Sequence, residues 1–550
     1  MKETTKKELP LEFIEALSYP AKKHRPLGKW PLSVPKDPII TDYTPIPGKK
    51  TTPKNFSYSL IFTAFDVRDY GPEIKKFIKI FDNLNIRRFY IESYRDGYSV
   101  DTALLKQVKK DLEKEGYAVS GCVTTTHLSD LAKYNESPSA ASCYTDKTAL
   151  KNLKKIFETT ASIFNEIIID DWFFTVCKCP ACVKAKGARE WPEYRCRIIA
   201  DAAKKYIIEP SKKINSKVKL ILKLPNWYQD FHKNGYDLER LVPLFDEIAV
   251  GTESRDPKTT RFMPVHGSML FTYIKQLAPE KVKKAWFDIY MCDEKIFTEQ
   301  AYQSLLGGAD EIIIFCAGII PQKTMRPLVT ALIESTEKID RLSGFSKIFA
   351  VPVIRAANTE GEEYLHQYLL MAGIPAYLTP VETKYREKLI ILTEQSAREQ
   401  DRPALFNRLL KLKKDILMTT GFAKSIKKYF GVKEVREEVR VSRIKYAGRT
   451  QHLDEELYLK LEVTDGKHLA LLNDAYPYLT SMKIKESKVY VVSIPVSAGK
   501  IKNIIGQEEP DDYRYMLKHP WFIEPIKTVV KPYANVLLYN GLKTLFKYDI

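Results

Sequence analysis

Two neighbouring carboxylates and a dense group of thiols lie together in one short stretch of the sequence. An apolar run ends in Asp170 and Asp171, and Cys177, Cys179 and Cys182 follow almost at once. Acidic residues at the carboxyl end of a strand lie where parallel α/β enzymes keep their catalytic groups. Three thiols this close together are typical of a metal-binding knuckle. The stretch therefore predicts the rim of an active site and a clip that holds it.

The thiols predict a structural zinc site. Zinc in such a site takes four ligands in a tetrahedral arrangement and prefers thiolates. Cys143 follows the third β-run, which neighbours the fourth in a barrel, so we expect it to complete the set with Cys177, Cys179 and Cys182. Cys196 is an alternative fourth ligand, and reduced thiols packed in a loop are the alternative to a metal. Eight cysteines in 550 residues do not make a disulfide scaffold.

Eight short β-runs alternate with amphipathic helical stretches in the first part of the chain. This count favours a (β/α)8 TIM barrel over an open doubly wound sheet. The runs are expected at 57–65, 87–92, 118–124, 166–170, 217–223, 247–251, 284–288 and 311–316. A second α/β unit is expected to begin after residue 347, with strands at 348–354, 373–378, 390–393 and 415–419. Later β-runs are expected at 457–464, 488–494 and 534–542.

Polar side chains stand at or just beyond the ends of the barrel runs, where they converge on one rim. A ring of carboxylates with interspersed cations and aromatic rings suits glycosidic-bond cleavage, in which one carboxyl protonates the leaving oxygen and another attacks or activates water. We predict Asp171 as nucleophile or base, with Glu253 or Asp288 as its partner. Any one of these carboxylates is as often an ion-pair partner or a helix cap, as the turn sequence at Asp256 illustrates. The residues expected to bind substrate are Asp66, Arg68, Glu92, Asp170, Lys223, Asn226, Trp227, Arg255 and Trp286.

The cysteine spacing and the order of the units resemble those of the family 42 β-galactosidases, which are (β/α)8 glycoside hydrolases with a zinc clip. The prolines and weak periodicity of residues 1–54 predict an irregular arm. The resemblance, which covers roughly residues 55–505, implies a catalytic barrel over 55–342, an amidotransferase-like α/β domain over 343–505 and a small β-rich segment over 506–550. It also implies a homo-oligomer, because enzymes of that family often associate. Three further segments, 169–174, 225–228 and 251–256, resemble a group of uncharacterised glycosidase-like bacterial proteins.

At two positions this sequence differs from the catalytic residues of that family, so the resemblance implies the fold but not the activity. The family carries an Asn-Glu pair at the fourth strand and a glutamate nucleophile at the seventh, where this chain has Asp170-Asp171 and Asp288. The β-galactosidase activity is therefore not carried over. Some α-glycosidase barrels use an aspartate nucleophile at the fourth strand and an acid at the sixth, and Asp171 with Glu253 fits that plan. Glutaminase chemistry is excluded in the second domain, because residues 345–505 contain no cysteine.

The composition leaves a few other functions open. The net charge of +18 comes mostly from lysines spread along the whole chain, which is typical of solvated helix faces, and no nucleic-acid motif accompanies it. We expect a carbohydrate substrate, with an acidic glycan kept as an option, and no nucleic-acid or membrane partner. The alternatives are a lyase or aldolase that uses Lys223 as a Schiff base, and a non-catalytic barrel that binds glycans or polyanions. No signal-peptide pattern is seen, so we expect a cytoplasmic protein, or a periplasmic or secreted one if an export signal has been removed.

Overall fold

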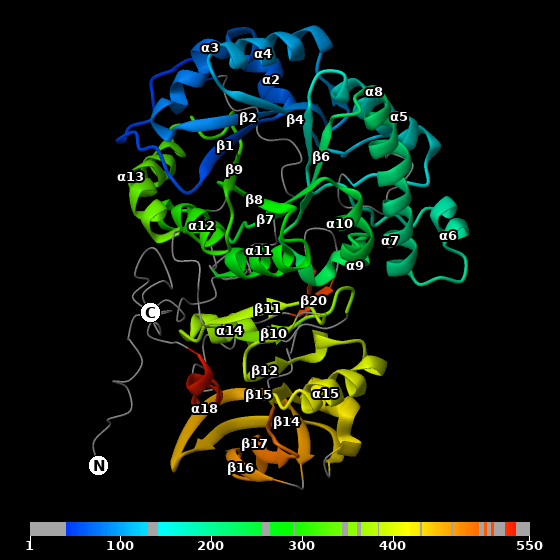
Figure 1. The fold of residues 1–550 in the computed structure, drawn as a ribbon, viewed down its shortest axis with the longest axis vertical. Helices are drawn as coiled ribbons and strands as arrows, with labels where there is room; N and C mark the ends of the chain where they lie inside the picture. Colours follow the sequence, from blue (N-terminus) through cyan, green and yellow to red (C-terminus); the bar gives the residue numbers. More distant parts are fainter. Residues whose placement is uncertain are drawn as a thin grey trace. The chain divides into compact units, whose positions relative to one another are not determined.

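The computed structural model separates into two compact units, whose described parts lie within residues 40–343 and 350–534 (Figure 1). The residues that the structure describes are 40–129, 141–255, 265–290, 292–343, 350–359, 365–382, 384–429, 432–463, 466–493, 500–502, 508–510 and 523–534. No helix within these ranges is both long and apolar enough to cross a membrane. Most of the predicted N-terminal arm and Asp256 lie outside the described residues.

The first unit contains a closed barrel of eight parallel strands, which confirms the predicted barrel. The strands follow the order β1-β9-β8-β7-β6-β5-β4-β2, and a pairing between β1 and β2 closes the ring. A short strand, β3 (Tyr98–Ser99), pairs with the end of β2 in the antiparallel sense. The barrel strands are β1 (Ser57–Phe62), β2 (Ile86–Arg95), β4 (Ala118–Val123), β5 (Glu166–Ile169), β6 (Lys219–Leu224), β7 (Glu247–Gly251), β8 (Val282–Asp288) and β9 (Glu311–Phe315).

Helices surround the barrel and bury the outer faces of its strands (Figure 1). Because both faces of each strand are covered, the strands are nearly continuous apolar runs, such as Ile167–Ile169, rather than alternating ones. The α-helices of this unit are α2 (Ala64–Tyr70), α3 (Ile74–Phe77), α4 (Thr102–Lys114), α5 (Lys147–Ala161), α6 (Pro180–Lys186), α7 (Trp191–Ala202), α8 (Glu209–Ile214), α9 (Phe231–Asn234), α10 (Leu238–Leu244), α11 (His266–Leu277), α12 (Glu294–Leu306) and α13 (Arg326–Ser343).

Two of the predicted runs end three residues away from their expected ends. The first was expected to reach residue 65, but β1 ends at Phe62 because Thr63 and Asp66 form a capping box that starts helix α2. The second was expected to end at Glu92, but β2 continues to Arg95. Both differences change which side chains face the carboxyl end of the barrel.

A second charged network lies near the amino ends of the strands, away from the predicted site. Lys284 lies 3.0 Å from Glu311 and 3.1 Å from Glu247, and Arg88 lies 2.9 Å from Glu166. Ser59 donates a hydrogen bond to Glu311 at 2.6 Å. Residues at this end of a TIM barrel serve stability rather than chemistry. This network therefore accounts for charged strand residues that take no part in the site.

The predicted N-terminal arm is described from residue 40 onward. Residues 40–54 form no helix or strand and lie against the barrel, where Ile46 is fully buried. The backbone amides of Lys54 and Asn55 both donate to the Asp340 carboxylate, at 3.0 and 2.9 Å. These bonds tie the entrance of the first strand to helix α13.

The second unit is built on a mixed sheet of nine strands, in the order β11-β10-β12-β13-β18-β17-β16-β14-β15. The first five are parallel to one another and the remaining pairings are antiparallel. The strands are β10 (Val351–Ile354), β11 (Ala376–Thr379), β12 (Leu389–Leu392), β13 (Asp415–Thr419), β14 (Val432–Tyr446), β15 (Arg449–Val463), β16 (Lys467–Leu472), β17 (Tyr476–Ile484) and β18 (Ser487–Val492). Helices α14 (Leu365–Met371), α15 (Arg402–Lys411) and α16 (Thr420–Ala423) accompany them. The amidotransferase-like identity of this domain stays a prediction.

The described part of the C-terminal segment contains a helix as well as a strand. Strand β20 (Glu508–Pro510) pairs with β19 (Lys500–Lys502), and helix α18 (Ile523–Val530) follows. The apolar residues of that helix are buried. The β-run expected at 534–542 lies outside the described residues from 535 onward.

Candidate active site and thiol cluster

The carboxyl ends of the barrel strands bring eight charged side chains into one connected group, which we call the carboxylate network. Its members come from the ends of β2, β5, β6, β7 and β8 or from the residues that directly follow them. They are Glu92, Arg95, Asp170, Asp171, Lys223, Glu253, Arg255 and Asp288. Because parallel strands end at the same edge of a barrel, residues far apart in sequence meet there.

Lys223 lies at the centre of this network. Its Nζ donates to Asp171 Oδ2 at 2.7 Å and to Glu253 Oε1 at 3.0 Å, and it lies 3.7 Å from Asp170 Oδ1. The side chain is only 3% exposed, and Nζ lies 4.6 Å from the centre of the Trp286 ring. Burial acts to lower the pKa of Lys223, but the three carboxylates outweigh it, so the pKa lies above its usual value. Lys223 is therefore a buried cation that gathers carboxylates.

Asp171 and Glu253 share the same ammonium group, and this fixes their separation. Since both oxygens bond one nitrogen, they lie no more than about 6 Å apart, which is close to the roughly 5–5.5 Å of retaining glycosidases and below the roughly 6.5–9.5 Å of inverting ones. The Asp171 side chain is 21% exposed, whereas that of Glu253 is 4% exposed. The geometry thus provides one carboxylate that water and substrate can reach, next to one that is enclosed.

Burial alters the protonation of this pair. It raises the pKa of Asp171 to about 7, helped by the nearby charges of Asp170 and Glu253 and opposed by Lys223. Burial also raises the pKa of Glu253. The Oε2 atom of Glu253 is buried and has no hydrogen-bond partner among the described residues. Two carboxyls with raised pKa values around one cation suit a reaction that needs one proton donor and one anion near neutral pH.

A bidentate ion pair holds the second group of carboxylates in the network. Arg95 donates to both oxygens of Glu92, at 2.8 and 3.0 Å, and to Asp170 Oδ2 at 3.0 Å. Thr124 donates to Glu92 and lies 3.0 Å from Asp170. Burial raises the pKa of Glu92 against the effect of Arg95. Burial also acts to raise the pKa of Asp170, but Lys223 and Arg95 together lower it below its usual value. Asp170 is therefore a fixed anion that orients its neighbours.

A second ion pair forms the wall on the side of β8. Arg255 donates to Asp288 Oδ1 at 3.2 Å and to Oδ2 at 2.5 Å, and the backbone amide of Tyr290 donates to Oδ1 at 3.1 Å. The side chain of Gln300, in helix α12, braces this wall. Its Oε1 accepts from the amide of Ser254 at 3.0 Å, and its Nε2 donates to the carbonyl of Asp288 at 3.0 Å. Asp288 is therefore already ion-paired with Arg255.

Polar and aromatic residues complete the site around Glu253. Asn226 Nδ2 donates to the carbonyl of Glu253 at 2.9 Å, and the His266 ring lies 2.7 Å from the carbonyl of Asn226. The Tyr236 hydroxyl donates to the carbonyl of Asp171 at 2.7 Å. Trp227 is partly exposed and packs edge-on against the Tyr236 ring, whereas Trp286 is 2% exposed. Trp227 is therefore better placed than Trp286 to stack on a sugar.

Two residues predicted to bind substrate have other partners. Asp66 completes the capping box of α2, and burial raises its pKa to about 6. Arg68 is half-exposed and bonds Asp69 at 2.6 Å rather than a member of the network. Glu92 belongs to the network but is fully buried, so it positions Arg95 rather than presenting an oxygen to solvent.

Three residues that the structure brings to this site were not among the predicted ones. Arg95 lies beyond the predicted end of its strand, Gln300 sits in a helix, and Tyr236 lies in a loop. A longer reading of the second strand would have found Arg95, because the aromatic Tyr94 favours continuation of the strand beyond Glu92. No local pattern marks the other two, since each acts through a contact distant in sequence.

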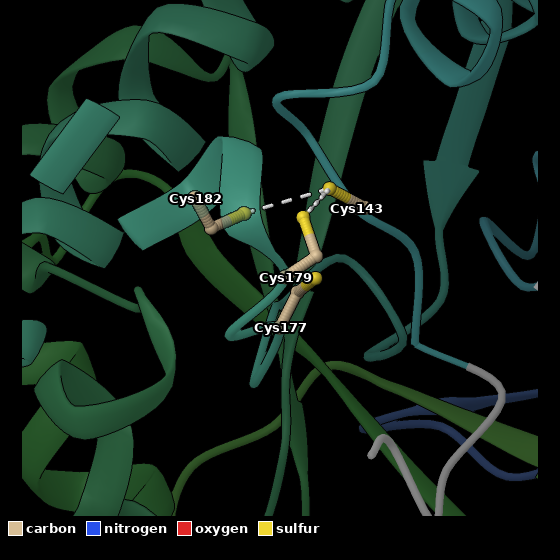
Figure 2. Close-up of side chains that lie close together, drawn as sticks. All are labelled: Cys143, Cys177, Cys179 and Cys182. Carbon is tan, nitrogen blue, oxygen red and sulfur yellow. Dashed lines mark hydrogen bonds between the residues drawn. The ribbon is translucent and has the colours of Figure 1, made fainter. Parts of the chain in front are cut away.

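The four predicted thiols come together on one side of the barrel unit (Figure 2). The sulfur atoms of Cys143, Cys177, Cys179 and Cys182 all lie within 4.8 Å of one another. Cys143 Sγ lies 3.5 Å from Cys182 Sγ and 3.9 Å from Cys179 Sγ. Tetrahedral zinc with bonds of about 2.3 Å would separate its sulfurs by roughly 3.8 Å. The cluster therefore has the donor set and the spacing to hold a metal ion.

The alternative fourth ligand is not part of this cluster. Cys196 lies in helix α7, where its sulfur bonds the carbonyl of His232 at 3.3 Å. Thr145 instead supports the cluster, because its hydroxyl lies 2.9 Å from Cys182 Sγ and 2.8 Å from the Tyr194 hydroxyl. Polar groups that hold the ligands in place are typical of metal sites.

Comparison with known structures shows that the whole architecture recurs in glycosidases. A GH42 β-galactosidase from G. stearothermophilus matches with a TM-score of 0.59 at 12% identity, over 87% of this chain and 89% of that one. An α-L-fucosidase isoenzyme from Paenibacillus thiaminolyticus matches with a TM-score of 0.58 at 11% identity, over 87% and 83%. An exo-β-1,4-mannosidase from Opitutaceae bacterium strain TAV5 gives 0.56 at 10% identity, over 92% and 99%. At these identities the likeness concerns the fold.

Comparison of sequences identifies the barrel unit more specifically. An uncharacterized protein of Saccharolobus solfataricus is 28% identical over 413 residues, which cover 69% of this chain and 68% of that protein. The family described as "Probable glycosyl hydrolase, catalytic domain" matches residues 48–330, which contain every strand of the barrel and the whole carboxylate network. The chain therefore belongs to this family of glycosyl hydrolases, as a (β/α)8 glycosidase that acts on a carbohydrate.

Proposed function

We propose that this protein is a retaining glycoside hydrolase in which Asp171 is the nucleophile and Glu253 is the acid and base. The observation that carries the proposal is the bond from one buried ammonium, Lys223 Nζ, to both carboxylates. It holds the two bonded oxygens no more than about 6 Å apart, which is close to the roughly 5–5.5 Å of retaining glycosidases and below the roughly 6.5–9.5 Å of inverting ones.

The roles follow from the surroundings of the two carboxyls. Near neutral pH, the raised pKa values and mutual repulsion favour a single proton on the pair. Glu253 is the more enclosed, and its Oε2 receives no hydrogen bond from the residues that the structure describes, so protonation removes a buried charge there. Asp171 loses its proton as the pH rises through about 7, because solvent reaches it and it has the shorter bond to Lys223. This assigns the anion to the carboxyl that substrate can reach.

The reaction then runs in two displacements. A carboxylate oxygen of Asp171 attacks the anomeric carbon, the bond from that carbon to the leaving oxygen breaks, and Glu253 gives its proton to that oxygen. In the second step Glu253 takes a proton from water, and the water oxygen attacks the anomeric carbon and releases Asp171. The excess of carboxylates in the network stabilises the positive charge that develops on the sugar ring. Asp170 and Lys223 orient Asp171 throughout, and Trp227 is the ring placed to stack on the sugar.

The position of Lys223 argues against the Schiff-base alternative. A lysine that attacks a carbonyl must be neutral, which requires a lowered pKa. Here Asp171, Glu253 and Asp170 hold the pKa of Lys223 above its usual value. Asp288 is likewise a weaker candidate for the second catalytic carboxyl than Glu253, because Arg255 binds both of its oxygens.

Hydrolysis of a panel of aryl glycosides, in both anomeric forms, tests the proposal. Asp171→Asn and Glu253→Gln should each lower kcat/KM by at least about 1000-fold on the best substrate, while the exposed surface variant Glu193→Gln stays at the wild-type value. Proton NMR of the first product should show the same anomer as the substrate. An inverted product, or full activity in Asp171→Asn, would refute the assignment. Binding of oligosaccharides without turnover of any glycoside would favour the non-catalytic alternative.

We further propose that Cys143, Cys177, Cys179 and Cys182 bind structural zinc. The sulfur spacing supports it, and four thiolates leave no open position for substrate. The ion would join the loop that follows β4 to the loop that follows β5, which begins at Asp170 and Asp171. Elemental analysis should find one zinc per chain, and Cys143→Ser should lose the zinc and lower the melting temperature. Wild-type protein free of zinc, with an unchanged melting temperature in the variant, would contradict this.

A further inference from the structure

The charge of the carboxylate network is opposite in sign to that of the whole chain. The chain carries a net charge of +18, whereas the network contains more carboxyl groups than cations. Its carboxyl groups are Glu92, Asp170, Asp171, Glu253 and Asp288, and its cations are Arg95, Lys223 and Arg255. The lysine-rich surface therefore says little about the charge that a substrate meets inside the site.

Each cation of the network is already bonded to carboxylates of the protein. Arg95 binds both oxygens of Glu92 and one of Asp170, and Arg255 binds both oxygens of Asp288. The charge of Lys223 is shared by Asp171 and Glu253. Within the described part of the chain, the network thus holds no cation that an acidic substituent of a sugar could pair with unless a buried ion pair breaks first.

We propose that the sugar unit bound over Asp171 carries no acidic group, which excludes uronic acids, sialic acids, and sulfated or phosphorylated sugars at that position. This inference rests on the proposed function, since it assumes that Asp171 faces the sugar. It narrows the substrate to an uncharged sugar at that position and removes the acidic glycan that the overall charge of the chain left as an option.

Two physical effects act in the same direction. An anionic substituent would lie among carboxylates in an enclosed site, where like charges repel strongly and solvent screens them poorly. Sugar hydroxyl groups, in contrast, donate hydrogen bonds to carboxylate oxygens, and such charge-assisted bonds are among the stronger ones. The network therefore favours a ring with free hydroxyls and disfavours the same ring with a carboxylate.

Matched pairs of sugars test this inference with the full-length protein. Each pair differs only at C6: 4-nitrophenyl glucoside with the glucuronide, and galactoside with the galacturonide, in both anomers. Hydrolysis is measured directly, and saturation-transfer NMR with glucose, galactose, mannose and their uronic acids measures binding. Within every pair that reacts or binds, we expect the neutral member to be favoured by at least about tenfold.

The Asp288→Ala variant provides an independent test of the cause. It removes the carboxylate that both Arg255 nitrogens bond, so a cation becomes available to the substrate. The preference for the neutral member should fall in this variant by about tenfold, while Glu193→Gln keeps the wild-type preference. An unchanged preference in Asp288→Ala would overturn the electrostatic explanation.

The possible failures can be told apart. If a uronide is cleaved as well as its neutral partner, the inference about the substrate fails and the proposed function stands. If a uronide is bound as well as its neutral partner but no member of any pair is cleaved, both fail. If the protein neither binds nor cleaves a member of any pair, the proposed function fails, and the inference fails with it.

Discussion

Replacing Gly251 by alanine tests whether the position of Glu253 limits catalysis. Gly251 is the last residue of β7, and its φ lies outside the left-handed region, so only space requires a glycine there. A Cβ atom at this position would lie 2.7 Å from Glu253 Oε2 and 3.0 Å from the carbonyl oxygen of Leu224. The backbone at Leu224 cannot move easily away from the new Cβ atom, so the Glu253 carboxyl must move instead.

The size of that movement follows from the distances. Ordinary contact begins at 3.4 Å, so the Glu253 oxygen must shift by about 0.7 Å from its place at 2.7 Å. A displacement of about 1 Å can cost roughly 100-fold in rate, so we expect kcat/KM to fall between about 10- and 100-fold. Since Glu253 is the proposed proton donor, the loss should be largest for a poor leaving group that needs the proton. An activated leaving group such as 2,4-dinitrophenol should lose much less.

A matched glycine variant separates this effect from simple overpacking. Gly121 also lies in a barrel strand, but its added Cβ would meet Phe164 and Thr160 side chains at 2.9 and 3.0 Å, outside the site. Both variants should lose about 1–3 kcal/mol of stability by thermal unfolding. Only Gly251→Ala should change the dependence of rate on the leaving group. Equal losses with good and poor leaving groups, or a kcat/KM for Gly251→Ala within twofold of wild type, would refute the reasoning.

Three further predictions concern the groups around this pair. Lys223→Met removes the cation from two buried carboxyls, so it should lower the free energy of unfolding by about 3–5 kcal/mol in thermal unfolding. It should also move the acidic limb of the pH–rate profile to higher pH, and an unmoved limb would count against the electrostatic role of Lys223. Gln300→Glu keeps the acceptor for the amide of Ser254 but places a carboxylate oxygen against the carbonyl oxygen of Asp288. We therefore expect kcat/KM to fall about tenfold relative to the wild-type protein, and no change would show that these hydrogen bonds of Gln300 are unimportant. The pKa of Asp171 is raised from 3.8 to about 7, so the stability linked to its proton is present below pH 4 and is lost as the pH rises toward 7. Between pH 4 and pH 7, the free energy of unfolding of Asp171→Asn should therefore rise relative to that of the wild type, by up to about 1.4 kcal/mol per pH unit. Denaturant titrations measure this difference, and a difference that does not change with pH would contradict the raised pKa.

Much of the barrel was predictable because each of its strands carries its own signal. Strands buried on both faces are short apolar runs, and Ile167 to Ile169 is as clear in the sequence as in the structure. The acidic residues that follow such runs had to meet, because parallel strands all end at one edge of the barrel. The gathering of Cys143 with the later thiols follows from the same rule, since β4 and β5 are neighbours.

The ends of elements and the partners of side chains depended on contacts that no local pattern records. The capping box of Thr63 and Asp66 turned a predicted strand end into the start of a helix, and it gives the Asp66 carboxylate a partner at the start of that helix. No sequence pattern indicates the hydrogen bonds that Gln300 accepts, because 45 or more residues separate it from the donating amides.

The sequence by itself determined that acidic groups, a lysine and four thiols would collect at the carboxyl ends of parallel strands, because short apolar runs set the strands and strand direction sets the edge. The tertiary structure alone decided which carboxylate pairs with which cation. Lys223 joins Asp171 to Glu253, and Arg255 takes Asp288, because these pairings depend on side-chain distances of about 3 Å across strands that are remote in the chain.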